Sequence, residues 1–233
     1  MKMTGVMTMT DSRIIGILKR SILFKDIDEE KIGDALFFFK AHVKRYRKGD
    51  TLHRMGEPMK EFGFVISGIV EVYTDDMEGN QMIMANVAEG ETFGESLSYL
   101  DIEDTPVYVS AKEDSEIIWM STKNLHLSRT ALDDTGKRIY ENFICMLATR
   151  TLNMNDRIQI LSKLKIRDKL ITFLSQCERK YGSRVFDLPF DRESLSTYLG
   201  TNRSALSREL SKMMDEGIIS FSKNRFEIKK AAY

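Results

Sequence analysis

The sequence "YLGTNRSALSRELSKMMDEGIISFSKNRFEIKK", residues 198–230, decides the fold of the carboxy-terminal third of the chain. A first short helix is predicted to begin after Asp191, whose carboxylate can accept hydrogen bonds from its first N–H groups, and to end at Gly200. A second helix is predicted to begin after Thr201 or Asn202 and to close before Gly217. Two helices joined by a tight glycine turn are typical of a helix-turn-helix.

The second helix has one apolar and one polar face. The apolar residues, which we expect to be buried, are Leu206, Leu210, Met213 and Met214. The polar residues, which we expect to contact DNA, are Asn202, Arg203, Ser204, Ser207, Arg208 and Lys212. In a helix-turn-helix the start of the second helix reaches base edges in the major groove, where arginine suits bidentate contact with guanine. The alternative is an ordinary helical hairpin with a solvated arginine–serine face.

Two short strands are predicted next, around residues 222–225, as in a winged helix. We expect Lys223 and Arg225 at the tip of this wing to contact phosphate. Residues 163–233 contain 15 lysines and arginines against 9 aspartates and glutamates, a net charge of +6, whereas residues 1–162 carry −6. This asymmetry is typical of a regulatory half joined to a nucleic-acid-binding half, so it favours DNA binding over the solvated hairpin.

Residues 43–121 have the pattern of a β-sandwich or small barrel. Apolar segments such as "FGFVISGIVEVYT" (62–74) break at turn residues, among them Ser67-Gly68 and Glu78-Gly79-Asn80. Short strands with glycine-centred turns at this spacing indicate an all-β unit. Helices are predicted on its amino-terminal side, within residues 11–41.

Residues 122–162 are predicted to be helical. An apolar stripe with two arginines recurs at steps of three and four residues: Ile139, Phe143, Ile144, Met146, Leu147, Arg150, Met154, Arg157, Ile158 and Leu161. The stripe is larger than one side of a barrel needs, which favours a helix–helix seam between two copies of the chain. The alternative is that the whole stripe lies on the barrel.

The composition argues against several classes of protein. No segment approaches eighteen uninterrupted apolar residues, and residues 1–11 lack the apolar run of a signal peptide, so we expect a cytoplasmic protein with no membrane partner. The two cysteines, Cys145 and Cys177, are too few for a disulfide framework and lack the Cys-x-x-Cys spacing. The three histidines are scattered, so no metal site is expected.

The order of these parts resembles the Crp/Fnr family of bacterial transcription regulators. The resemblance covers the chain from about residue 20 and rests on "LFKDIDEEKI" (23–32), "YRKGDTLHRMGEPMKEFGFVISGIVEVY" (46–73), "GETFGES" (90–96) and "YLGTNRSALSRELSKMMDEGII" (198–219). It implies an α+β fold in three parts. These are a sensor domain with a double-stranded β-helix of jelly-roll or cupin-like form (1–132), a long dimerisation helix (133–162) and a winged helix-turn-helix (163–233).

The resemblance also implies that the effector is not cAMP. In members that bind cyclic nucleotides, "FGE" is followed by an Arg-Ser or Arg-Thr pair, and the arginine neutralises the cyclic phosphate. Gly94 and Glu95 match the first part, with Glu95 at the ribose-contacting carboxylate, as a ligand contact or as a structural remnant. Thr105 and Pro106 replace the pair, and a buried phosphate without a cation is costly.

Other cofactors of the family are not expected either. The iron–sulfur branch uses an amino-terminal cysteine cluster, whereas the first cysteine here is Cys145. The haem branch needs a Cys or His ligand in the roll, and His53, which we expect to be exposed, is a poor candidate. The residues that would line an effector pocket are Phe64, Ile66, Phe93, Gly94, Glu95, Ser96, Leu97, Thr105, Tyr108, Met154 and Asn155. A collapsed, self-filled roll is the alternative.

We therefore interpret the chain as a homodimeric transcription regulator and not an enzyme. Its expected partners are a near-palindromic duplex DNA, a second copy of the chain, RNA polymerase and an unidentified small-molecule effector. Ser204 replaces the family's glutamate beside the first arginine, so we expect a half-site other than the family's best known one. The alternatives are a cyclic-nucleotide-binding module that acts through protein partners, and a cupin-like enzyme, for which the barrel lacks histidine and carboxylate ligands.

Overall fold

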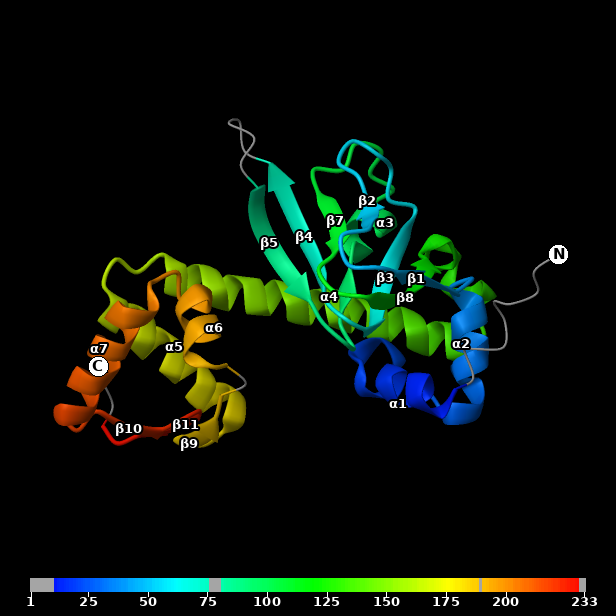
Figure 1. Ribbon diagram of the computed structural model, residues 1–233. Coiled ribbons are helices and arrows are strands. Elements are labelled where there is room, and N and C mark those ends of the chain that lie inside the picture. The colour runs from blue at the N-terminus through cyan, green and yellow to red at the C-terminus, as the bar shows by residue number, and fades with distance from the viewer. Residues whose placement is uncertain (1–10, 76–80, 189, 231–233) are drawn as a thin grey trace. The chain divides into compact units, whose positions relative to one another are not determined.

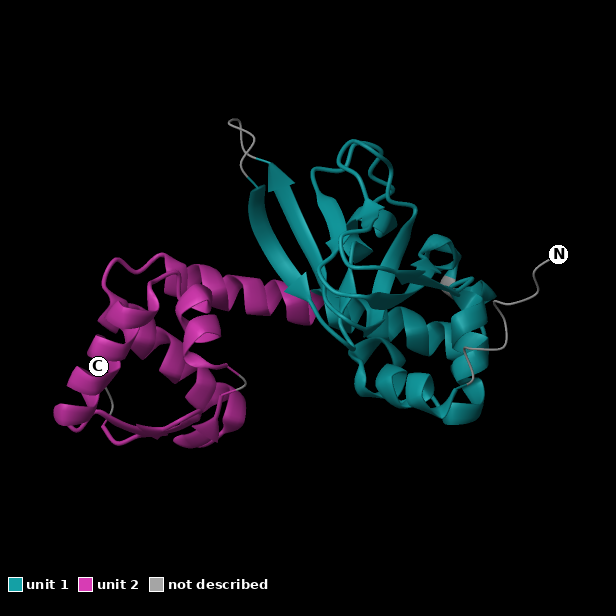
Figure 2. Ribbon diagram, in the orientation of Figure 1, with its two compact units in different colours: residues 1–147 teal, residues 148–233 magenta. Residues whose placement is uncertain are grey.

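The computed structural model forms two compact units, residues 1–147 and 148–233 (Figure 2). It describes residues 11–75, 81–188 and 190–230. The amino-terminal segment that was assessed for a signal peptide therefore lies, except for residue 11, outside the described residues. The turn predicted at Glu78-Gly79-Asn80 lies outside them as well.

The first unit contains a roll of two four-stranded antiparallel sheets (Figure 1). One sheet has the strand order β1-β8-β3-β6 and the other β2-β7-β4-β5. The strands confirm the predicted β region, and their bounds are β1 His42–Tyr46, β2 Thr51–His53, β3 Glu61–Ser67, β4 Val70–Asp75, β5 Gln81–Val87, β6 Thr92–Phe93, β7 Tyr108–Ala111 and β8 Ser115–Ser121. The predicted break at Ser67-Gly68 is confirmed, since Gly68 has φ +84°, which permits the tight turn between β3 and β4.

Strand β3 separates two cores because its side chains alternate between the faces of the sheet. Phe64 and Ile66 belong to a core shared with the helices, whereas Val65 belongs to the core inside the roll. The ring of Phe93 lies against Gly63, where a Cβ would approach it to 2.1 Å. The roll is therefore packed closely at this point.

The helices of the first unit are α1 Ser12–Arg20, α2 Ile32–Phe38, α3 Glu95–Tyr99 and α4 Asp134–Leu161, of which α4 continues into the second unit. The prediction that residues 122–162 form one helical run is wrong before Asp134. Two 3-10 turns, Lys123–His126 and Arg129–Ala131, occupy that segment. Leu125 is buried within the first 3-10 turn. The backbone then becomes extended at Leu127, so the segment cannot continue as one helix.

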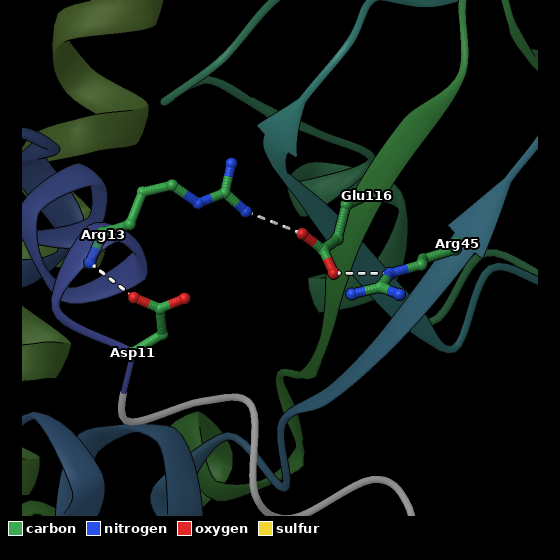
Figure 3. Close-up of polar contacts among 4 residues, drawn as sticks. All are labelled: Asp11, Arg13, Arg45 and Glu116. Carbon is green, nitrogen blue, oxygen red and sulfur yellow. Dashed lines mark hydrogen bonds and ion pairs between the residues drawn. The ribbon is translucent and has the colours of Figure 1, made fainter.

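A buried carboxylate fastens α1 to the roll (Figure 3). Glu116 on β8 is 6% exposed and accepts hydrogen bonds from Arg13 Nη2 and Arg45 Nε, both at 2.9 Å. Asp11 caps α1 by accepting a hydrogen bond from the backbone N–H of Arg13 at 2.9 Å. The two arginines supply the charge partners that a buried carboxylate requires.

The second unit is a winged helix around one apolar core (Figure 1). Its elements are α5 Ile166–Tyr181, β9 Val185–Asp187, α6 Arg192–Tyr198, α7 Arg203–Asp215, β10 Ile219–Ser222 and β11 Arg225–Ile228. The predicted helix pair and hairpin are confirmed. Strand β9 was not predicted from the sequence. It pairs with β11 and completes a three-stranded sheet. Across the described ranges, no helix is long and apolar enough to cross a membrane.

Candidate nucleic-acid interface and effector site

The turn between α6 and α7 forms as the sequence predicts. Asp191 Oδ1 accepts a hydrogen bond from Ser194 N at 2.7 Å and begins α6, and backbone hydrogen bonding lowers the pKa of this carboxyl. Asn202 Oδ1 accepts from Ala205 N at 2.8 Å and begins α7. Gly200 has φ +57°, a conformation that glycine adopts at no steric cost. The two caps therefore fix where each helix starts.

Helix α5 supports this turn through contacts that the sequence did not reveal. Lys169 Nζ donates to the carbonyl oxygens of Leu199 at 2.9 Å and Gly200 at 3.1 Å, and so satisfies carbonyl groups at the end of α6. Arg167 pairs with Glu216 at the end of α7 and, at 3.5 Å, with Glu209. These long-range pairs leave no periodic signal in the sequence.

The polar face of α7 is open to solvent. Arg203, Ser204 and Arg208 are exposed, whereas Ser207 is half-buried. The buried face consists of Leu206, Leu210 and Met213. The prediction that Met214 is also buried is wrong, since it is 41% exposed. Met214 follows Met213 by one residue, and one step rotates a side chain by about 100° around a helix, away from the core.

The cations of this face are held loosely. Arg203 Nη1 lies 4.0 Å from Glu193, and Arg225 Nη1 lies 4.0 Å from Asp187, with all four side chains mostly exposed. Exposed pairs of this kind contribute little free energy, so these guanidinium groups can turn to an external anion. Arg208 and Lys223 form no ion pair with any other described residue.

Arg192, the first residue of α6, attaches the wing to the helices. Its guanidinium carbon lies 4.9 Å from the ring centre of Phe221 and 5.2 Å from that of Phe226. Its Nη2 donates to the carbonyl oxygen of Lys223 at 2.9 Å, at the turn between β10 and β11. A hollow of about 310 Å³ adjoins this contact and is lined by Asp191, Arg192, Glu193, Arg203, Lys223 and Asn224. The start of α7 and the tip of the wing therefore border one concave surface, which carries three cations and two carboxylates.

The structure distributes the predicted effector residues over several environments. Phe64 and Ile66 face the helices, whereas Phe93 lies inside the roll. The ring of Tyr108 stacks on Tyr73 with the ring centres 5.2 Å apart. Leu97 is partly buried against the roll core, and Ser96, Met154 and Asn155 are exposed. These side chains therefore do not all meet in one interior space.

Glu95, which the resemblance places at a ribose-contacting position, lies at the start of α3 directly after Gly94. Gly94 has φ +80°, and Glu95 is only 2% exposed. Thr92 Oγ1 donates a hydrogen bond to Glu95 Oε1. The carboxylate is therefore engaged within the protein.

Thr105, at the position of the family's phosphate-binding arginine, is fully buried and joins two loops. Its hydroxyl donates to the carbonyl oxygen of Glu57 at 2.8 Å, so it can only accept the hydrogen bond of 2.6 Å from His53 Nε2. The expectation that His53 is exposed is wrong, because this hydrogen bond places its side chain in the loop packing, at 8% exposure. Burial lowers the pKa of His53, although the nearby Glu57 opposes this shift.

The described residues contain no candidate metal cluster, and one of the two cysteines is buried. No group of three or more His, Cys, Asp or Glu side chains in that part of the chain is placed to hold an ion. Burial raises the pKa of the Cys177 thiol to about 11, so it stays protonated near neutral pH. Cys145 is exposed on α4.

A β roll with a buried glutamate at the start of α3, joined by a long helix to a winged helix-turn-helix, defines a class of DNA-binding transcription regulators. Comparison with known families agrees with this class. The profile of the family described as "Cyclic nucleotide-binding domain" matches residues 43–126, and that of the "Crp-like helix-turn-helix domain" matches residues 168–233. The chain belongs to the Crp/Fnr family of transcription regulators.

Individual relatives match over nearly the whole chain. The Cyclic AMP receptor protein of Thermus thermophilus is 25% identical over 215 residues, which cover 92% of this chain and 95% of that protein. The crystal structure of the Catabolite Activator Protein of Thermus thermophilus has a TM-score of 0.50 at 24% identity and covers 91% of this chain and 95% of its own. The c-di-GMP responsive regulator CLP of Xanthomonas campestris has a TM-score of 0.54 at 21% identity, over 87% of this chain and 100% of its own. The two structural matches show a shared fold.

Proposed function

We propose that this regulator reads DNA sequence with α7 and contacts the phosphate backbone with its wing. The observation that carries the proposal is the exposed face of α7, where Arg203, Ser204 and Arg208 stand opposite the buried side chains of the helix. Arg203 and Arg208 are assigned to base edges, with Asn202, Ser207 and Lys212 beside them. Lys223 and Arg225 are assigned to phosphate. Arginine at the start of a recognition helix reads guanine through two parallel hydrogen bonds.

We further propose that the protein acts as a homodimer through α4. The supporting observation is an exposed apolar seam on that helix, in which Ile144, Met154, Ile158 and Leu161 are each between 42% and 60% exposed. With Leu147, they are spaced by three, seven, four and three residues, which places all of them on the a and d positions of one heptad register. Ile139 and Phe143, by contrast, are buried in the core of the first unit. A two-fold dimer would bind a near-palindromic site with half-sites about 10 bp apart.

The effector is proposed to be something other than cAMP. Thr105 supplies no cation for a cyclic phosphate, and its hydroxyl is already donated to Glu57. Binding of an effector to the roll would change the relative rotation of two α4 helices and so the spacing of the two recognition helices. The family resemblance adds RNA polymerase as an expected partner at the promoter.

Substitution of Arg208 tests the DNA proposal. On its selected site, Arg208→Ala should cost about 1–3 kcal/mol of binding free energy, because a bidentate base contact is lost, and on random duplex DNA it should cost much less. The measurement is DNA affinity by fluorescence anisotropy over a series of salt concentrations. Arg179→Ala, which removes an exposed arginine of α5, is the matched control and should leave both affinities near those of the wild type. An equal loss on both DNAs would show that Arg208 contacts phosphate alone.

A further inference from the structure

A cavity of about 460 Å³ opens between the first sheet of the roll and the segment that carries β2. Its floor is aromatic and apolar, formed by Tyr46, Leu52, Pro58, Met59 and Trp119. Trp119 Nε1 donates to Tyr46 Oη at 3.0 Å, which satisfies the indole donor. A cavity of this volume accommodates a small organic molecule.

The rim of the cavity is strongly cationic. Four lysines, Lys40, Lys44, Lys60 and Lys123, line it together with a single carboxylate, that of Glu61. Lys60 is already paired with Asp101, at 2.7 Å. Within the described part of the chain, the other three lysines form no ion pair, although Lys44 Nζ lies 4.8 Å from the ring centre of Tyr46.

Glu61 offsets only part of the charge of this rim. Its carboxylate lies 3.7 Å from Nδ1 of His42, which also lines the cavity. Asp101 interacts with both Lys60 and Lys123, so the four lysines face two carboxylates and the rim keeps a net positive charge. An anion placed among these ammonium groups relieves their mutual repulsion. A lysine acts on phosphate as a point charge and needs no fixed geometry.

We propose that this cavity binds a small aromatic phosphate monoester, with the ring on the Trp119 side and the phosphate among the lysines of the rim. An apolar floor beneath a cationic rim matches a molecule that has a flat apolar body and an anionic head. The cavity has no residue in common with the effector residues predicted from the sequence. Its floor nevertheless backs onto the turn before Glu95, because Trp119 packs edge-on against Phe93 with the ring centres 5.4 Å apart.

Trp119 is the only tryptophan of the chain, so its fluorescence reports on the floor of the cavity directly. The full-length protein, without DNA, is titrated with phenyl phosphate, and in parallel with inorganic phosphate and with benzyl alcohol. We expect a saturable change with phenyl phosphate at a Kd below about 1 mM, and at least tenfold weaker binding of the other two probes. The absence of DNA makes the result independent of the function proposed for α7.

Two charge variants assign the binding to the rim. Lys44→Gln with Lys123→Gln should weaken phenyl phosphate binding at least tenfold. Lys25→Gln with Lys31→Gln, which removes two exposed lysines outside the cavity, should leave the Kd unchanged. The proposal would be overturned by the lack of a saturable signal or by equal binding of phenyl phosphate to both double variants. It would also be overturned if benzyl alcohol or inorganic phosphate bound as tightly as phenyl phosphate.

Discussion

Single buried polar residues show how this chain differs from cyclic-nucleotide-binding relatives. By the family resemblance, Thr105 falls at about the position of a phosphate-binding arginine, and its hydroxyl joins the loop of Glu57 to that of His53. A sequence comparison reveals only the loss of a cation at this position. The structure adds that Thr105 forms two neutral hydrogen bonds there, which connect the two loops. These bonds hold the loops together only while each donor still faces an acceptor.

The titration of His53 should make the first unit less stable in acid. Burial in the folded state lowers the pKa of His53 below its ordinary value of 6.5. The unfolded chain therefore binds the proton more readily than the folded chain does. The contribution of His53 to the free energy of unfolding is therefore fully present above pH 6.5 and is lost as pH falls through the lowered pKa. His53→Gln, which can still donate to Thr105, should show a smaller loss of stability on acidification than the wild type.

Denaturant unfolding, followed by the fluorescence of Trp119 at pH values on both sides of 6.5, measures this difference. Trp119 lies in the first unit, so the signal reports that unit and not the winged helix. Parallel pH dependences for the wild type and His53→Gln would contradict the assignment, because they would show that the titrating group lies elsewhere.

At the scale of elements, the attachment of the wing to α6 depends on Arg192. Arg192→Lys keeps the charge but loses the planar group that stacks on Phe221 and Phe226. Since partly desolvated cation–π contacts contribute about 1–2 kcal/mol, the variant should lower the stability of the second unit by about that amount. It should also weaken binding to specific and random DNA alike, because the wing is assigned to phosphate.

Thermal unfolding, followed by circular dichroism, and anisotropy on both DNAs measure the effects of Arg192→Lys. Arg179→Lys, an exposed substitution of the same kind on α5, is the control and should change neither. If Arg192→Lys lowered affinity for the selected site alone, the wing would have to contribute to base recognition, contrary to its assignment to phosphate.

The elements that the sequence predicted are those with strong local signals. Caps, glycine turns and apolar periodicity indicated the helix pair of α6 and α7, and alternating strands with glycine turns indicated the roll. Strand β9 has only three residues and gains its partner from β11, which lies about forty residues later, so no local pattern reveals it. The burial of His53 likewise depends on Thr105, more than fifty residues away.

The cavity of the first unit escaped prediction for the same reason. Its floor and rim come from five places in the chain: the end of the α2 turn and β1, β2, the segment before β3, the start of β3, and β8 with the 3-10 turn after it. The resemblance directed attention to the residues around Glu95 instead. Sequence patterns identify elements and their caps, whereas the assembly of distant side chains into a site follows only from the tertiary fold.

At the scale of the whole molecule, the proposed homodimer makes recognition of a two-fold-symmetric site depend on two copies of the chain. Ile158→Glu places a charge in the exposed seam of α4 and should convert the dimer to a monomer, since a buried unpaired carboxylate is costly. Affinity for a two-fold-symmetric site should then fall at least tenfold, because one subunit contacts a single half-site. Sedimentation velocity measures the mass in solution, and anisotropy measures the affinity.

Asn153→Asp is the matched control for Ile158→Glu. It adds the same charge to α4 at an exposed position outside the seam, so it should leave both the mass and the affinity unchanged. A wild-type protein that sediments as a monomer, or an Ile158→Glu variant that remains a dimer, would show that α4 does not form the interface.

A selection from random duplex DNA with the purified full-length protein tests whether the winged helix reads DNA sequence. The retained molecules are sequenced after several rounds. The account predicts enrichment of a two-fold-symmetric motif with half-sites about 10 bp apart, and loss of that motif with Arg208→Ala. Retention that depends on salt but enriches no sequence would contradict it, because the second unit would then bind DNA by charge alone.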